Sequence, residues 1–294
     1  MSVISFDVGG TAVKHALFNE EGKLVDKNFY PTPDDRPAFM NKIVEIVEHY
    51  QEKAQIDSVS FSFPGFIDPQ TGFAEASGAI PYFYKQNIKE LVGEATAFRY
   101  PIFVENDANC AALAEKHSGN GQNVENFLLF TIGTGIGGAL YLNDALYRGF
   151  QFKAGEMGKM RINYTLDPEK TLHNFCSIHV LIHTYKKYKG LDGLDRVSGE
   201  MIFEEVKQNP EVRAIVDKWL DRLCIGILNV VTMLNPEKIL IGGGISAHPD
   251  LVPYLNRRME RLEDWTKDFQ VPIEACAYMN DAGVVGAYVN ATQK

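Results

Sequence analysis

The chain has 294 residues, of which 45% are hydrophobic and 23% charged, so it is long enough to bury one large core or two smaller ones. Its formal net charge is −9 and no run is rich in lysine or arginine, which argues against nucleic acid or an anionic membrane as a partner. The four cysteines form no CxxC pair, which indicates reduced thiols. Met1 directly precedes a strand pattern, and no apolar run reaches about 18 residues, so we predict a cytoplasmic protein.

The first half of the chain predicts a meander of strands followed by alternating helices and strands. Residues 2–30 contain three strand patterns, and a turn at Gly9 and Gly10 separates the first two. An apolar stripe at helical spacing then precedes a strand that stops at Pro64 and Gly65. The elements expected after the meander are a helix over 36–54, a strand over 57–63, a short helix over 87–95, a strand over 100–106 and a helix from Asp107.

The second half starts in the same way, so we predict an internal duplication. The stretch "NFLLFTIGTGIGG" is a strand that runs into a glycine-rich turn, and two further strand patterns follow it. We expect two similar α/β lobes that face each other across a central cleft. The later elements expected are a long helix over 212–235, strands over 238–244 and 271–277, and a helix over 282–293. The predicted lobes comprise residues 1–117 with the C-terminal helix at about 282–294, and residues 118–281.

The motif "DVGGT", Asp7 to Thr11, places a carboxylate at a strand end beside two glycines and a hydroxyl. Glycines let backbone amides surround a phosphate, and Asp7 can hold Mg²⁺ directly or through water. An ordinary hairpin turn beside an aspartate explains the motif equally well.

The motif "TIGTGIGG", Thr131 to Gly138, repeats this arrangement and also satisfies GxGxxG. A dinucleotide-binding motif requires a helix directly afterwards, whereas "ALYLNDALYRG" predicts a strand, a turn and a strand. We therefore favour a second phosphate-binding hairpin over a dehydrogenase, and no GxxxxGK[ST] motif indicates a P-loop.

In "FVENDANCAALAE", Asp107 stands where a strand ends and a helix begins. A helix N-cap would explain it, at about 1 kcal/mol of stabilisation. The neighbouring Glu105 and Asn106 exceed what a cap requires, and a carboxylate here can accept a proton from a substrate hydroxyl during phosphoryl transfer from ATP. The glycines of "NPEKILIGGGIS" suit a flat adenine or ribose, whereas those of "DAGVVGAY" are better explained by close helix packing.

Taken in order, "DVGGT", "FPGFID", "ENDANCAALAE", "TIGTGIGG", "AGEMG", "NPEKILIGGG" and "DAGVVGA" resemble the ROK family of sugar kinases and related repressors. The resemblance covers nearly the whole chain. It implies an actin-like ATPase fold with two ribonuclease H-like lobes, each with a mixed sheet and flanking helices, and an ATP- and Mg²⁺-dependent kinase acting on a hexose. Repressor members carry a DNA-binding helix-turn-helix at the N-terminus, and no basic helix precedes the first strand here, so a regulator is not favoured.

The resemblance implies Asp107 as the general base, with sugar contacts from Gly65, Asn106, Asp107 and Glu156, and Asp7 as the Mg²⁺ residue. It implies a homodimer as well. The residues implied for the ATP phosphates and adenosine are Asp7, Gly9, Gly10, Thr11, Thr131, Gly133, Thr134, Gly135, Gly137, Gly243 and Gly244.

The chain departs from the family at Lys159. Most members have a histidine there that contacts the sugar and binds a structural zinc, followed by a CxCGxxGC-type run and a second sugar-binding glutamate. Here "KTLHNFCSIHVLIHTYKK" retains only Cys176 and offers no match to that glutamate. The set His173, Cys176, His179 and His183 lies along one predicted helix, from which ligands cannot close a tetrahedron, so we expect no zinc site. Lys159 is either a donor to a sugar oxygen or a solvated loop lysine.

Retained Asn106, Asp107 and Glu156 imply recognition around the 3-, 4- and 6-hydroxyls, whereas the contacts near C1 and C2 are changed. A site that is less closed at C1 admits a β-linked aglycone, and "SGAIPYF" also resembles the β-glucoside kinases of the family. We therefore predict phosphorylation of a β-glucoside, at the 6-hydroxyl. The alternatives are an N-acetylmannosamine kinase, glucokinase, allose kinase or fructokinase, and, from another class, a non-catalytic sugar sensor.

Overall fold

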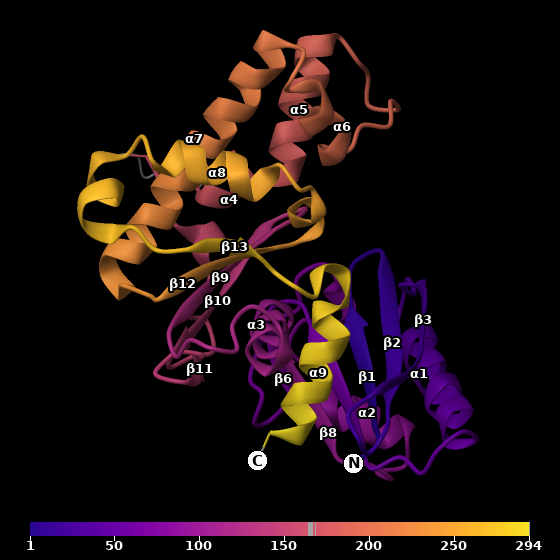
Figure 1. The fold of residues 1–294 in the computed structure, drawn as a ribbon. Helices are drawn as coiled ribbons and strands as arrows, with labels where there is room; N and C mark the ends of the chain where they lie inside the picture. Colours follow the sequence, from indigo (N-terminus) through magenta and orange to yellow (C-terminus); the bar gives the residue numbers. More distant parts are fainter. Residues whose placement is uncertain (164–166, 168, 294) are drawn as a thin grey trace. The chain divides into compact units, whose positions relative to one another are not determined.

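The computed structural model describes residues 1–163, 167 and 169–293 and divides the chain into two compact units (Figure 1). Unit 1 contains Met1–Ser118, Arg148–Ala154 and Asp281–Lys294, and unit 2 contains Gly119–Tyr147 and Gly155–Asn280. The chain therefore leaves unit 2 at residue 148 and re-enters it at residue 155, an excursion that the predicted division at residue 117 does not contain.

Unit 1 is built on a five-stranded sheet in the order β3-β2-β1-β4-β8. The first three strands are antiparallel because short turns join them, whereas β1, β4 and β8 are parallel and are joined through helices. The strands are β1 (Val3–Val8), β2 (Ala12–Phe18), β3 (Leu24–Pro31), β4 (Ser58–Phe63) and β8 (Ile102–Asn106). The helices are α1 (Arg36–Gln51), α2 (Ile88–Ala95), α3 (Asp107–Ser118) and α9 (Ala282–Thr292).

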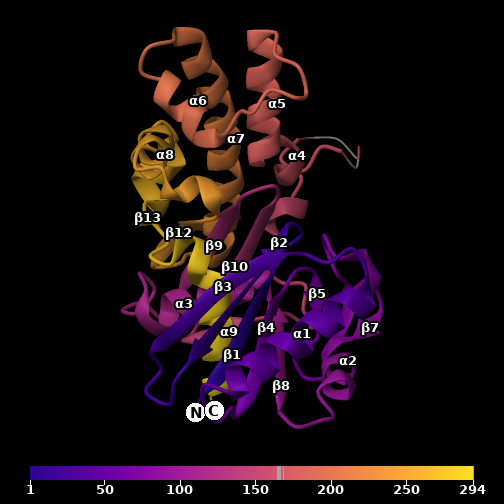
Figure 2. The ribbon, with the colours of Figure 1, turned by 90° about the vertical axis from the view of Figure 1, so that its right-hand side faces the viewer.

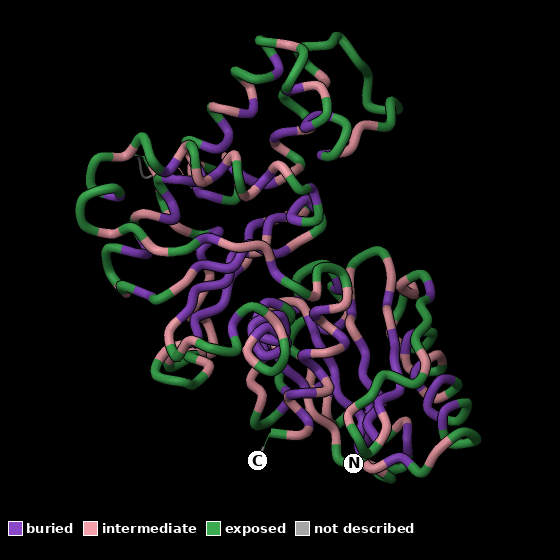
Figure 3. The backbone as a smooth tube through the Cα atoms, viewed as in Figure 1, coloured by how far each residue is buried: buried purple, intermediate pink, exposed green. Residues whose placement is uncertain are grey.

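The two faces of this sheet are covered differently. Helices α1 and α2 lie on one face, where Phe39, Tyr50 and Val92 join Phe6 and other strand residues in an apolar core (Figure 2). Helices α3 and α9 cover the other face, where the sheet presents small serines (Figures 1 and 2). Strands β1, β2 and β4 between these layers are largely buried, whereas the edge strand β3 is mostly exposed (Figure 3). Unit 1 also contains a small three-stranded sheet that the sequence patterns did not predict. Its strands are β5 (Phe66–Ile67), β6 (Phe73–Ala76) and β7 (Gln86–Asn87), and the short helix η1 (Pro81–Phe83) lies between β6 and β7 along the chain.

Unit 2 repeats the topology of unit 1, with the sheet order β11-β10-β9-β12-β13 and the same change from antiparallel to parallel pairing. The repeat confirms the predicted pair of α/β lobes with mixed sheets. Its strands are β9 (Phe127–Ile132), β10 (Ile136–Leu142), β11 (Ala145–Tyr147), β12 (Lys238–Gly242) and β13 (Ile273–Ala275). Its α-helices are α4 (Leu172–Cys176), α5 (Ile178–Lys189), α6 (Gly199–Glu205), α7 (Pro210–Leu234) and α8 (Leu251–Met259). The 3₁₀ helices are η2 (Met157–Lys159), η3 (Gly244–Ala247) and η5 (Met279–Asp281), which leads into α9. The segment η4 (Trp265–Phe269) is a π-helical turn.

One prediction about unit 2 is wrong. Residues 172–189 form two helices and not one, because Ser177 has an extended backbone (φ −65°, ψ 156°) between α4 and α5. Helix α7 runs for 25 residues as expected, and its buried stripe includes Trp219 and Leu223. Within the part of the chain that the structure describes, no helix combines the length and apolarity needed to cross a membrane.

The close approach of α9 to α3 explains the glycines of "DAGVVGAY". A Cβ added at Gly286 would lie 1.8 Å from the backbone oxygen of Cys110, and one at Gly283 would lie 2.2 Å from the Cγ of Asp7. The buried Ser5, Ser60 and other small side chains on the facing strands leave the room that this packing needs. The predicted packing role of these glycines is confirmed.

The substitution Gly286→Ala therefore forces backbone apart in the centre of unit 1. We expect it to lower the free energy of unfolding by about 3 kcal/mol, at the upper end of the usual cost of overpacking, as measured by urea denaturation followed by circular dichroism. Asn290→Ala, a half-buried position in the same helix, is the matched control, with an expected change below about 0.5 kcal/mol. Equal effects of the two substitutions would contradict the packing argument.

Candidate active site

The hairpin between β1 and β2 carries the first predicted phosphate loop. Gly9 N–H donates to the carbonyl of Ala12 over 3.0 Å, and the Thr32 hydroxyl donates to the Gly9 carbonyl over 2.5 Å. Gly10 and Thr11 are exposed in unit 1. A Cβ on Gly10 would lie 2.6 Å from that of Ala79, so a side chain here would meet the neighbouring loop. The turn thus presents exposed backbone at Gly10, where no side chain covers it, and at Thr11, which adds a hydroxyl.

Asp7 lies one residue before the end of β1, next to this turn. Its Oδ1 accepts a hydrogen bond of 2.9 Å from the Ser62 hydroxyl, and its Oδ2 lies 3.1 Å from the Lys14 Nζ. The Asp7 side chain is 19% exposed, and the missing side chain of Gly283 leaves room for the carboxylate. A partly exposed carboxylate beside a glycine turn fits a Mg²⁺ ligand, direct or through water.

Three acids gather at the carboxyl ends of the parallel strands of unit 1. Asp7 pairs with Ser62 across β1 and β4, and Ser62 pairs with Glu105 across β4 and β8, so two of the acids lie in one row of the sheet. The third, Asp107, begins α3 two residues after Glu105. Burial, as the largest cause, raises the pKa of the Cys110 thiol well above its usual value. The negative charges of Glu105, Asp7 and Asp107 raise it further, so all three acids lie near this residue of α3.

The junction of β8 and α3 holds Asn106 and Asp107. The cap of α3 is Asn106, whose Oδ1 accepts the Asn109 N–H over 3.1 Å, so the alternative explanation of Asp107 as the N-cap does not apply. Asp107 is exposed, and its Oδ1 accepts the Ala108 N–H over 2.9 Å and the Asn106 Nδ2–H over 3.0 Å. These two bonds orient an exposed carboxylate at the end of a strand.

Gly65 acts on this junction through its carbonyl oxygen, which accepts the Asn106 Nδ2–H over 2.9 Å. Its φ of +107° favours glycine, and a Cβ there would lie 2.1 Å from the carbonyl oxygen of Ala76. Gly65 therefore holds Asn106 in place, which the sequence motif alone did not show.

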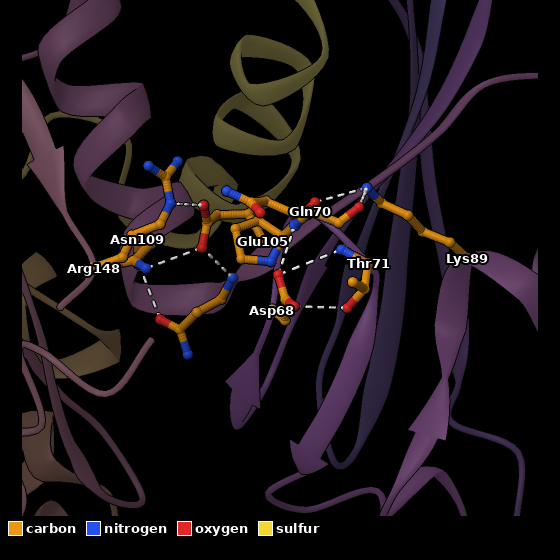
Figure 4. A network of polar contacts seen from close by, with 9 residues as sticks. Asp68, Gln70, Thr71, Lys89, Glu105, Asn109 and Arg148 are labelled. Carbon is orange, nitrogen blue, oxygen red and sulfur yellow. Dashed lines mark hydrogen bonds and ion pairs between the residues drawn. The ribbon is translucent and has the colours of Figure 1, made fainter. Parts of the chain in front are cut away.

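Glu105 is fully buried and has a partner for each carboxylate oxygen (Figure 4). Its Oε1 accepts the Asn106 N–H and the Asn109 Nδ2–H, each over 2.9 Å. Its Oε2 accepts the Arg148 Nε–H over 2.6 Å. Figure 4 also shows the neighbouring turn, where Asp68 accepts from Thr71 and Lys89 donates to the backbone of residues 69 and 70.

Sequence reasoning missed Arg148 because the pattern "ALYRG" reads as a strand through that residue. The strand β11 ends at Tyr147, and Arg148 begins the excursion into unit 1. The available signal was Glu105 itself, since an acid inside an apolar strand needs a cation or several N–H donors.

The second glycine hairpin joins β9 to β10, which confirms that a strand and not a helix follows "TIGTG". Thr131 precedes the turn, and Gly133 N–H donates to the Gly135 carbonyl over 2.9 Å. Gly133 has open space around it, whereas Gly135 lies against the ring of His173. Thr134 is exposed at the tip, and Gly137 follows in β10 opposite Thr131. The turn thus offers exposed backbone, as its counterpart in unit 1 does.

The glycines after β12 differ from each other. Gly243 has a φ of +89°, and a Cβ there would lie 2.3 Å from the Ile132 carbonyl oxygen, so packing against β9 explains it. Gly244 has open space around it, which leaves room for a ligand such as adenosine.

Glu156 and Lys159 line one polar cavity of about 570 Å³ in unit 2. The volume is within the range of about 300–1,000 Å³ that is usual for small-molecule sites. Burial raises the pKa of Glu156, and the positive charge of Lys159 lowers it. The residues that line the cavity are Ile136, Glu156, Gly158, Lys159, Arg161, Glu169, Thr171, His173 and Asn174.

The residues considered above as a zinc site lie in different surroundings. They are His173, Cys176, His179 and His183. Cys176 is buried, its thiol lies 3.8 Å from the Trp219 carbonyl oxygen, and burial raises its pKa to about 12. His179 and His183 are exposed on α5, whereas His173 lies at the cavity against Gly135. Among the described residues, no group of three or more His, Cys, Asp or Glu side chains is placed to hold a metal ion.

Comparison with known proteins places this geometry among sugar kinases. The profile of the ROK family matches residues 3–294. The beta-glucoside kinase of Listeria monocytogenes is 33% identical over an alignment that covers 100% of this chain and 98% of that protein. The beta-glucoside kinase of Klebsiella pneumoniae is 32% identical, with 100% and 97% coverage.

Solved structures are similar to this chain in fold. A ROK family protein of Streptococcus pneumoniae in complex with sucrose has a TM-score of 0.86 at 27% identity, and the match covers 99% of this chain and 97% of that one. A ROK family glucokinase of Streptomyces griseus, in complex with glucose and AMPPNP, has a TM-score of 0.82 at 23% identity and 98% coverage of both chains. The latter likeness is one of fold.

If no metal holds the segment around Cys176, removing metal ions should not destabilise the protein. We expect incubation with excess EDTA to change the melting temperature by less than about 1 °C, since a structural zinc contributes folding free energy directly. Differential scanning fluorimetry with and without EDTA, combined with metal analysis of the purified protein, checks this. A clear fall in melting temperature, reversed by added zinc, would contradict it.

Proposed function

We propose, since this chain belongs to the ROK family, that it is an ATP-dependent sugar kinase that phosphorylates a β-glucoside at its 6-hydroxyl. The observation that carries the proposal is the exposed Asp107 carboxylate, oriented by Asn106 and Ala108 at the end of a parallel strand. The carboxyl ends of parallel strands are where α/β folds bind their ligands.

In the proposed mechanism, Asp107 accepts the proton of the attacking sugar hydroxyl as the phosphoryl group is transferred. Asn106 supports this role in two ways, because its side chain both caps α3 and donates to Asp107 Oδ1. The carboxylate is therefore held in one orientation before the sugar binds, which reduces the entropy lost on reaching the reactive arrangement.

The two glycine hairpins supply backbone for the ATP phosphates. In unit 1 the exposed Gly10 and Thr11 serve this role, and in unit 2 Gly133 and Thr134 do so. Asp7 would hold Mg²⁺, which when bound neutralises charge on the transferred phosphoryl group. We assign the open space at Gly244 to the adenosine.

The choice of a β-glucoside rests on the relatives and on the cavity beside Glu156. Both beta-glucoside kinases named above match the whole chain at 32–33% identity. The cavity is lined by donors and acceptors, Lys159 and Asn174 among them, and therefore suits a hydroxylated ligand. We propose that Glu156 accepts from hydroxyls of the phosphorylated ring and that Lys159 lies towards the linked group.

Two other functions compete. N-acetyl-D-glucosamine kinases and a glucokinase are among the relatives, at 29–30% identity, so a monosaccharide kinase is the nearest alternative. A non-catalytic sugar sensor is the alternative from another class. A coupled assay of ADP release on glucose, cellobiose, gentiobiose, N-acetylglucosamine, N-acetylmannosamine, allose and fructose separates the three. Highest kcat/KM on a β-glucoside supports our proposal, highest kcat/KM on a monosaccharide favours the first alternative, and no turnover on any sugar favours the sensor.

We further propose that the enzyme works in the cytoplasm as a homodimer. All four cysteines are buried and none is in a disulfide, in keeping with a reducing compartment. The dimer rests on family resemblance, and light scattering of the purified protein gives its mass directly.

The substitution Asp107→Asn removes the proposed base while keeping the side-chain shape. We expect kcat to fall by a factor of about 10²–10⁴ with an unchanged melting temperature, because general-base catalysis contributes that much. Asp34→Asn, an exposed acid of the same unit, is the control and should retain normal turnover. Near-normal kcat in Asp107→Asn would rule out this mechanism.

The raised pKa of Glu156 predicts how KM depends on pH. The ionised carboxylate accepts sugar hydroxyls, and burial makes it protonate at a pH above the ordinary 4.5, so KM for the sugar should rise on acidification. Lys159→Ala removes the charge that lowers this pKa, so the rise should begin at a higher pH. Glu156→Gln should have a high KM that no longer rises on acidification. A rise that persists in Glu156→Gln would assign the titration to another group.

A further inference from the structure

We propose that Arg148 is a positioning residue for the catalytic Asp107 and acts through the buried carboxylate of Glu105. The inference rests on the proposed function, because it assumes that Asp107 is the base. It adds a residue that no sequence motif singled out and that comes from a separate segment of the chain, the excursion 148–154.

Arg148 forms an ion pair with Glu105. The Nε–Oε2 distance is 2.6 Å, and the Glu105 side chain is only 1% exposed whereas that of Arg148 is 31% exposed. A buried carboxylate without a cation is costly, so the pair defines where the Glu105 side chain lies. The planar guanidinium donates in a fixed direction, which restrains the carboxylate more tightly than a lysine would.

Glu105 in turn binds the junction of β8 and α3. The other oxygen of Glu105 accepts the backbone N–H of Asn106 and the side-chain N–H of Asn109, each over 2.9 Å. One buried carboxylate therefore joins the last residue of the strand to the first turn of the helix. These two residues are also bonded to each other, from Asn109 N–H to Asn106 Oδ1.

Asn106 connects this junction to the proposed base, Asp107. Asn106 uses its Nδ2 to donate both to Gly65 and to the Oδ1 of Asp107. A rotation of Glu105 would move the Asn106 backbone and the Asn109 side chain and, through them, the donor that orients Asp107. The series from Arg148 to Asp107 is unbroken, and each contact is 3.1 Å or shorter.

The excursion that carries Arg148 is itself held to unit 1. Lys153 pairs with Glu75 at 2.8 Å and lies over the ring of Phe66. Gly149 and Gly155 have φ values of +73° and +81°, which let the backbone turn at either end. Lys153 does not contact Glu105, and its pair with the half-exposed Glu75 is worth at most about 1 kcal/mol. Its loss should therefore leave the excursion in place, so it provides a matched control within the same seven residues.

The experiment compares Arg148→Ala, Arg148→Lys and Lys153→Ala in steady-state kinetics and thermal unfolding. We expect Arg148→Ala to lower kcat about ten- to hundredfold, the scale of a misplaced catalytic group, with KM for ATP and sugar within about twofold of the unsubstituted enzyme. Arg148→Lys keeps the charge and should stay folded, with an intermediate kcat. Lys153→Ala should match the unsubstituted enzyme.

A purely structural role for Arg148 would lower the melting temperature but leave kcat per folded molecule unchanged. That result in Arg148→Ala would overturn the proposal. If Arg148→Ala fails to fold, an unchanged kcat in Arg148→Lys would overturn it instead.

A double-mutant cycle adds a second test. In an Asp107→Asn background, loss of Arg148 should have no further effect on residual turnover, because a positioning residue acts only through the group that it positions.

Additive effects in that cycle would also overturn the proposal, since they would show that Arg148 acts independently of Asp107. Failure of the proposed function gives a different result. If Asp107 is not the base, Asp107→Asn has near-normal turnover, with or without a substitution of Arg148.

Discussion

The arrangement of the candidate site in unit 1 depends on the burial of the Glu105 carboxylate. A charged group at that depth requires donors, and the three that it has come from the end of β8, the first turn of α3 and the excursion at Arg148. The same bonds determine where Asn106 lies, and Asn106 in turn orients Asp107. The geometry of the exposed acid is therefore a consequence of how a buried acid is neutralised.

The repeated topology of the two units explains why glycine hairpins occur twice. In each unit the first strand of a β-hairpin also pairs in parallel with a later strand, so the hairpin turn lies at the carboxyl end of the parallel pair. The repeats have diverged in what stands before the turn. Asp7 occupies that place in unit 1, and Thr131 in unit 2. One unit thus contributes a carboxylate and the other a hydroxyl to otherwise similar loops.

Much of the fold was predictable from local patterns. The meanders, the helix with Phe39 and Tyr50, and the 25-residue α7 follow from apolar spacing, which one burial face imposes on each element. The break at Ser177 was not predictable, because the residues on both sides have helical spacing and only their packing separates α4 from α5. The small sheet β5-β6-β7 escaped prediction because two-residue strands carry no period.

The motifs alone show which residue types stand at strand ends, because each motif is contiguous along the chain. These residues are Asp7, the run Glu105 to Asp107 and the two glycine turns. What each of them does depends on contacts between distant segments. The tertiary structure made Asn106 the cap, Gly65 the support of Asn106, and Arg148 the partner of Glu105. The physical reason is that a buried charge is satisfied by whichever donor the fold brings near. Arg148 is 43 positions away from Glu105, and no local pattern records that contact.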